Sequence, residues 1–169
     1  LKEEDISDKI KVLLDEEVEV YTPREDETLA NLAKEVDATF PFPDSVVKSL
    51  SKGSKEDFVG RLKKEAHSLY GDREKVFTKP VLRQIEREVH LQVLDNLWMQ
   101  NLENMQHLRE GINWRSVGQR DPLVEYRKEG QKLFEQMQAD MRSETVRTLF
   151  RAVPHTHAHP EEPHEHDAD

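Results

Sequence analysis

The residues of this chain best suited to metal chemistry are histidines close to its end. Five of its eight histidines stand at alternating positions there: His155, His157, His159, His164 and His166. Imidazole nitrogens bind zinc, nickel and copper, and a flexible segment can wrap several of them around one ion. The acids Glu161, Glu162 and Asp167 lie among them. The pattern leaves two interpretations open, a functional zinc site or a solvated acidic tail that binds metal only incidentally.

A second group of residues is suited to contact with a partner. It forms the predicted tip of a helical hairpin, and its members are Trp114, Arg115, Ser116, Val117, Gly118, Gln119 and Arg120. An apolar side chain at a loop tip either packs back on its own helices or contacts another molecule. The arginines could pair with acidic loops or lipid headgroups, although exposed ion pairs contribute little each. The residues alone favour neither interpretation.

The sequence contains no pattern that predicts catalysis within this chain. It has no phosphate-binding G-x-x-x-x-G-K-[ST] loop, no G-x-G-x-x-G and no cysteine. Most carboxylates fall on helix faces where charged side chains are normally solvated. His90 and His107 lie beside apolar positions of a helix, so we interpret them as packing residues rather than as bases or ligands. We therefore expect no catalytic residue and no resident cofactor here.

The composition excludes several other classes of protein. The formal net charge is −10, which disfavours binding to nucleic acid. No run of about 20 apolar residues predicts a membrane-spanning helix, and no signal peptide opens the chain. The first residue is Leu1 rather than methionine. We expect the chain to be a piece of a longer protein.

The elements that must position these residues are all helical, so we predict an all-α fold. Residues 1–21 form an amphipathic helix. Residues 22–78 form a lobe of short helices, the last of which ends near Gly71. Residues 79–153 form a long antiparallel two-helix hairpin, and residues 154–169 form a disordered tail rich in histidine and acids.

The hairpin is the clearest of these predictions. Pro80 suits a first helical turn, and apolar residues then recur at helical spacing to Ile112. Asp121 and Pro122 predict a new helix start, an N-cap followed by proline at the first position. A loop over residues 111–120 forces the two helices to lie antiparallel. Four aromatic side chains are expected to pack in its core: Trp98, Tyr126, Phe134 and Phe150.

The hairpin sequence also resembles a known family. The matching stretches are Val93–Trp98, Leu102–Ile112, Arg115, Gln119–Pro122, Glu125–Glu129 and Phe134. Together they resemble the signature of SecA, the motor subunit of the bacterial preprotein translocase. The resemblance extends less strongly over residues 1 to about 153. Asn101 replaces the usual histidine, Val117 is smaller than the usual tip residue, and the family's cysteine-rich zinc segment is missing.

The resemblance implies an architecture and a function. The hairpin would be the two-helix finger of the helical scaffold domain, and the lobe would be the helical wing domain. The helix over residues 1–21 would belong to the junction of the scaffold and the wing. The finger would enter the cytoplasmic mouth of the SecY channel in SecYEG, and its tip would contact the unfolded preprotein. ATP and magnesium would be used by motor domains of the parent protein, so this chain alone would be inactive.

The implied location is the cytoplasmic face of the bacterial plasma membrane, where SecA is peripheral and meets acidic lipids. Two other functions stay open. One is a stand-alone helical adaptor that binds other proteins, and the other is a metal-binding protein that uses the histidine-rich tail.

Overall fold

The computed structural model describes residues 3–115 and 121–152 of the chain, and these residues form α-helices joined by turns. The helices are α1 (Glu3–Glu19), α2 (Leu29–Thr39), α3 (Asp44–Leu50), α4 (Phe58–Phe77), α5 (Lys79–Arg115) and α6 (Pro122–Arg151). No strand occurs within these two ranges. The all-α prediction is confirmed. The predicted tail, residues 154–169, lies outside the described residues.

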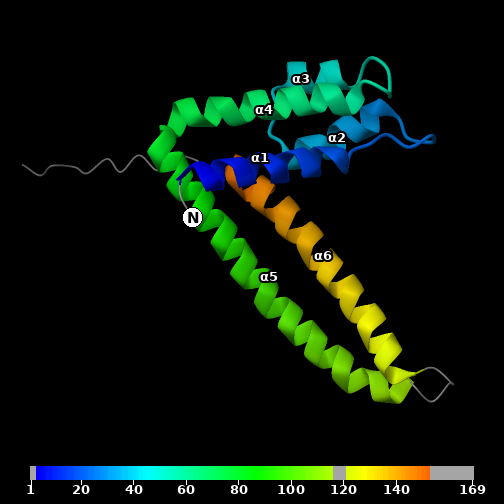
Figure 1. The fold of residues 1–169 in the computed structure, drawn as a ribbon. Coiled ribbons are helices and arrows are strands. Elements are labelled where there is room, and N and C mark those ends of the chain that lie inside the picture. The colour runs from blue at the N-terminus through cyan, green and yellow to red at the C-terminus, as the bar shows by residue number, and fades with distance from the viewer. Residues whose placement is uncertain (1–2, 116–120, 153–169) are drawn as a thin grey trace, which may run out of the picture.

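The arrangement consists of a long hairpin and a helical lobe that covers its open end (Figure 1). Helices α5 and α6 pack along each other and project away from α2, α3 and α4. Helix α1 lies beside α4 in the opposite direction and also contacts both arms of the hairpin. The base of the hairpin therefore has a second surface to pack on, whereas the described helices project away from this surface toward their far end.

The lobe is built from local signals that the sequence carries. Thr28 caps α2 by accepting a hydrogen bond from the Asn31 N–H at 3.3 Å. The backbone of Gly53 has a φ of 112°, a conformation that glycine adopts without steric penalty. Ser54 Oγ donates a hydrogen bond to Asp57 Oδ2 at 3.0 Å in the turn just before α4.

Two predicted helix ends were wrong because buried side chains outweigh a glycine. Helix α4 continues past Gly71 to Phe77, since Tyr70 and Phe77 are buried on either side of that glycine. Helix α5 likewise continues past Gly111 to Arg115, with Ile112 buried. A glycine inside a helix costs only about 1 kcal/mol relative to alanine. Burial of one large apolar side chain contributes more than that.

The core joins the lobe to the base of the hairpin. Its centre is Phe40, which stacks on Phe42 with ring centroids 5.6 Å apart. Phe150, near the end of α6, meets the Phe40 ring edge-on at 5.5 Å. Ile6 and Val18 of α1 are fully buried in the same cluster. Burial of apolar surface thus fixes the end of the returning helix against the lobe.

Candidate functional site

The predicted tip lies at the closed end of the hairpin. The backbone of Trp114 and Arg115 belongs to the last turn of α5. Ser116, Val117, Gly118, Gln119 and Arg120 lie outside the described residues. So do the five tail histidines, His155, His157, His159, His164 and His166. The predictions for these side chains therefore remain predictions. The structure describes the two helices that lead into and out of the tip.

The start of the returning helix is held by a capping contact beside the tip. Asp121 accepts a hydrogen bond from the Leu123 N–H at 2.8 Å, and Pro122 occupies the first turn of α6. This is the N-cap and proline arrangement that the sequence predicts. Helix α6 thus begins one residue after the tip, and α5 ends at the other side of it. The tip is carried directly on two helix ends.

The seam between the two arms is closely packed. Gly130 of α6 is buried, and a Cβ atom at that position would lie 3.0 Å from the methyl carbon of Met105. The two helices approach closely there because glycine has no side chain. Ile112 and Met137 are also buried in this part of the molecule. Helix α5 contains 37 residues, so the hairpin forms an arm about 55 Å long.

The outer sides of the arm carry apolar residues that the sequence placed in the core. Trp98 is 45% exposed and Phe134 is 40% exposed, so the prediction that they pack in the core was wrong. A helix in a two-helix arm has one neighbour, and only the narrow stripe that faces this neighbour becomes buried. Phe150 is buried, as predicted, because the lobe supplies a further surface at the base. Tyr126 is partly buried.

The base of the arm is fixed by polar contacts that sequence reasoning missed. Glu17 of α1 is buried and accepts hydrogen bonds from Arg142 Nε at 3.0 Å and Ser143 Oγ at 2.8 Å. Arg73 of α4 donates to the carbonyl of Ala152 at 2.5 Å, just after α6 ends. A usable signal existed in the sequence, since Glu17 follows Leu13 and Leu14 at helical spacing. An acid within an apolar stripe is a candidate for buried pairing.

Ion pairs also connect helix α1 to helix α4. Asp15 pairs with His67 at 2.6 Å and with Lys63 at 2.9 Å. Burial alone would raise the pKa of Asp15, but the hydrogen bonds and charges of His67 and Lys63 hold it below the usual value. The two helices at the base therefore contact each other through both apolar and ionic groups.

A second buried carboxylate lies where α4 meets α5. Glu86 is fully buried, and its Oε1 accepts a hydrogen bond from the Tyr70 hydroxyl at 2.5 Å. Arg83 Nη1 approaches Glu86 Oε2 to 2.6 Å and the Tyr70 hydroxyl oxygen to 2.5 Å. Burial raises the pKa of Glu86 even though Tyr70 and Arg83 oppose that shift. Burial and the neighbouring Glu86 raise the pKa of Tyr70 to about 12.

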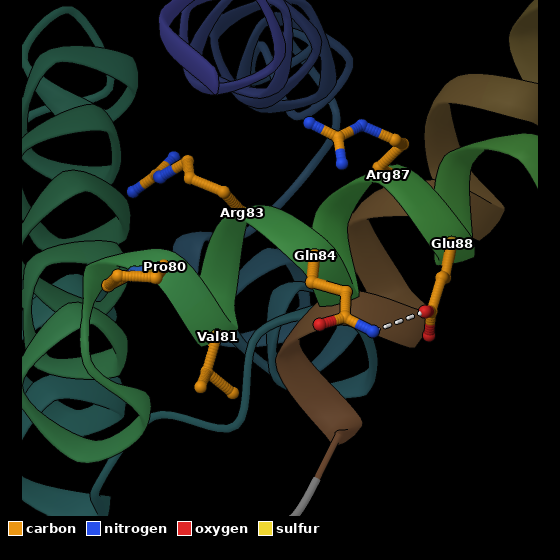
Figure 2. A pocket seen from close by; sticks show the side chains of 6 residues that line it. All are labelled: Pro80, Val81, Arg83, Gln84, Arg87 and Glu88. Atoms are coloured by element: carbon orange, nitrogen blue, oxygen red, sulfur yellow. Dashed lines mark hydrogen bonds between the residues drawn. The ribbon is translucent and has the colours of Figure 1, made fainter. Parts of the chain in front are cut away.

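The first turns of α5 line a hollow of about 420 Å³ at this corner (Figure 2). Its walls include Pro80, Val81, Arg83, Gln84, Arg87 and Glu88. Arg83 points toward α4 and Arg87 toward α1, whereas Gln84 donates a hydrogen bond to Glu88 at 2.9 Å. The polar side chains at this corner therefore reach toward neighbouring helices as well as into the hollow.

The described residues show neither a metal cluster nor a membrane-spanning helix. Within residues 3–115 and 121–152, no three His, Asp or Glu side chains are grouped so that they could hold a metal ion. His90 is buried, and its Nδ1 has no hydrogen-bond partner there. Of the helices in this part of the chain, none combines the length and apolarity needed to cross a membrane.

Comparison with known proteins identifies the architecture. The family described as the SecA wing and scaffold domain matches residues 1–153, which include every described helix. The chain belongs to the SecA family. The matched range covers the lobe and both arms of the hairpin, so the wing and scaffold domain of SecA accounts for the whole described fold.

Individual SecA proteins align with most of the chain. The protein translocase subunit SecA of Thermodesulfovibrio yellowstonii is 32% identical over 155 residues, which is 89% of this chain and 17% of that protein. The SecA of Syntrophobacter fumaroxidans is 35% identical over 146 residues, 86% of this chain and 17% of that protein. The SecA of Acidothermus cellulolyticus is 45% identical over 100 residues, 56% of this chain and 10% of that protein. The chain thus spans less than a fifth of the length of these relatives.

Proposed function

We propose that this chain is the wing and scaffold part of a SecA motor that moves preproteins through the SecYEG channel. The observation that carries the proposal is the arm itself, a closely packed hairpin whose base is fixed on the lobe and whose two described helices project away from it. Such an arm can transmit a displacement of its base to a distant tip. Membership of the SecA family supports the same assignment.

In this proposal the tip residues contact the channel mouth and the moving polypeptide. In this proposal Trp114 and Val117 provide an apolar surface, and Arg115 and Arg120 pair with acidic loops of SecY or with acidic lipid headgroups. Apolar contact is non-directional, so one surface can hold many different sequences weakly. Such a contact suits a substrate that has no fixed fold and passes through residue by residue.

The energy for movement is assigned to motor domains of the parent protein. The sequence of this chain has no phosphate-binding loop. ATP and magnesium would therefore be bound elsewhere in the parent, and the scaffold would convert their chemistry into motion of the tip. The cytoplasmic face of the plasma membrane is the location that this role requires.

The proposal is tested by transport in the full-length parent motor. Val117→Gly removes the apolar side chain of the tip, and we expect slower preprotein transport by inverted membrane vesicles. Val117→Tyr serves as the matched variant because it restores a large apolar surface, and we expect it to keep or increase transport. Equal transport by the wild type and Val117→Gly would contradict the assigned role of the tip.

A further inference from the structure

The junction of α4 and α5 is a single residue in a strained conformation. Thr78 has a φ of 62° and a ψ of 152°. Left-handed φ values are disfavoured for residues other than glycine, and most strongly for β-branched ones such as threonine. Strained backbone persists where the surrounding structure leaves the residue no alternative. We propose that Thr78 is a strained hinge, held by side chains of α4 and α5 that fix the angle between the wing and the finger.

The side chains that hold the hinge are named here the elbow cluster: Tyr70 and Glu74 of α4, and Arg83 and Glu86 of α5. The cluster crosses the junction in three contacts. The Tyr70 hydroxyl donates to Glu86 Oε1, Arg83 Nη1 donates to the Tyr70 oxygen, and Arg83 Nη2 pairs with Glu74.

The burial of the cluster makes these contacts costly to break. Glu86 is 0% exposed, Tyr70 is 3% exposed and Arg83 is 6% exposed. Separation of α4 from α5 would leave a buried charge without part of its hydrogen bonding, which is strongly unfavourable. The elbow cluster therefore opposes any rotation that opens the junction.

The backbone on both sides of Thr78 is fixed as well. The Leu82 N–H donates to the Thr78 carbonyl at 3.0 Å, which starts the hydrogen bonding of α5. Phe77 and Leu82 are both buried. Because the residues on both sides of Thr78 are held in place, they cannot absorb a change of the Thr78 φ to a negative value. Such a change would rotate α5 as a whole relative to α4. Over an arm of about 55 Å, a rotation of about 10° moves the tip by about 10 Å.

The hinge deepens the proposed function and depends on it only for its role in transport. A lever whose angle is set by a strained residue has two arrangements, one held by the elbow cluster and one in which Thr78 is relaxed. Loss of the cluster's contacts would release the strain and move the tip without any change along the arm itself.

The test measures the angle between α4 and α5 in the 169-residue chain. The sequence has no cysteine, so Ser68→Cys on α4 and Gln100→Cys on α5 provide two unique sites for spin labels at exposed positions. The double variant Tyr70→Phe/Glu74→Gln removes the Tyr70 hydroxyl and the Glu74 charge on the α4 side. It keeps the ion pair between Arg83 and Glu86 within α5. Electron-electron double resonance then gives the distance between the labels.

We expect the label distance to shift by several ångströms in the Tyr70→Phe/Glu74→Gln chain and to stay at the wild-type value in a Lys75→Gln control. Lys75 forms an exposed pair with Asp72 on the same helix, outside the elbow cluster. Adding Thr78→Gly to the Tyr70→Phe/Glu74→Gln chain should reduce the shift, because glycine tolerates a positive φ without strain.

An unchanged distance in a folded Tyr70→Phe/Glu74→Gln chain would overturn the proposal, since the cluster would then only stabilise the fold. A shift of equal size with Thr78 and with Thr78→Gly would overturn the role of strain. If the double variant does not fold, Tyr70→Phe alone supplies the same comparison, with a smaller expected shift. These distances do not depend on transport, so the hinge and the proposed function can fail separately.

Discussion

Truncation of Phe150 tests how the hairpin is anchored on the lobe. Phe150 is 1% exposed and meets the Phe40 ring at 5.5 Å with the ring planes 60° apart. Removing a buried aromatic side chain loses about 2–3 kcal/mol of apolar burial. The lost edge-on ring contact adds about 1 kcal/mol. Phe150→Ala should therefore lower the free energy of unfolding by about 3–4 kcal/mol, within the range known for such truncations.

The assay is urea unfolding followed by circular dichroism at 222 nm. With a slope of about 2 kcal/mol per molar urea, the Phe150→Ala midpoint should fall by about 2 M. Phe134→Ala is the matched control, because the same side chain is 40% exposed on the arm. Its effect should stay below about 1 kcal/mol. Equal losses for the two variants would refute the conclusion that the lobe, rather than the arm, provides the core.

The remaining predictions concern the buried polar groups and the tail. Burial, with Lys9 nearby, lowers the pKa of His90, so stability is present above pH 6.5 and is lost as the pH falls from 6.5 toward the lower folded value. His90→Leu should remove part of the difference in urea midpoint between pH 7.5 and pH 5.5. Glu17→Ala leaves Arg142 without its buried partner and should lower stability by about 3 kcal/mol in the same urea assay. Lys11→Ala breaks only an exposed pair and should change stability by less than about 0.5 kcal/mol. If the histidines form a zinc site, deletion of residues 154–169 should abolish zinc binding in calorimetry and leave the helical signal per folded residue unchanged.

The hairpin could be predicted from sequence because its signals are local. Asp121 and Pro122 mark the start of α6 by their own chemistry, and the observed helix begins at Pro122. Apolar spacing likewise predicts α1 to within two residues at its end. These features depend on residues within one or two helical turns, so no tertiary contact is needed to recognise them.

The errors arise where tertiary contacts decide. Trp98 and Phe134 have the spacing of core residues, but spacing does not reveal whether a helix has one neighbour or two. Glutamates such as Glu17 and Glu86 normally lie on the solvated face of a helix. Here both are buried, because hydrogen-bond partners on α6 and on α4 satisfy their carboxylates. Glycines 71 and 111 act as helix breakers only when no buried neighbour holds the helix.

The candidate site likewise has one part that could be predicted from local sequence and one part that depends on tertiary contacts. The SecA resemblance of the hairpin could be recognised from sequence because its motif is local and specific, and the family match over residues 1–153 confirms that resemblance. The polar contacts that fix the base of the hairpin join residues far apart in the sequence, such as Glu17 and Arg142, which are 125 positions apart. No local pattern contains both members of such a pair, so these residues required the structure.

Contact between the tip of the hairpin and the polypeptide during transport is the core of the proposed function. It is tested by placing Val117→Cys in the full-length parent, which is compared with Gln92→Cys near the base of α5, an exposed position. A preprotein with single cysteines is stalled in SecYEG, and disulfide formation is measured. We expect crosslinks from position 117 to the stalled chain and to SecY, and none from position 92. Active transport without crosslinks from position 117, or with equal crosslinks from both positions, would contradict it.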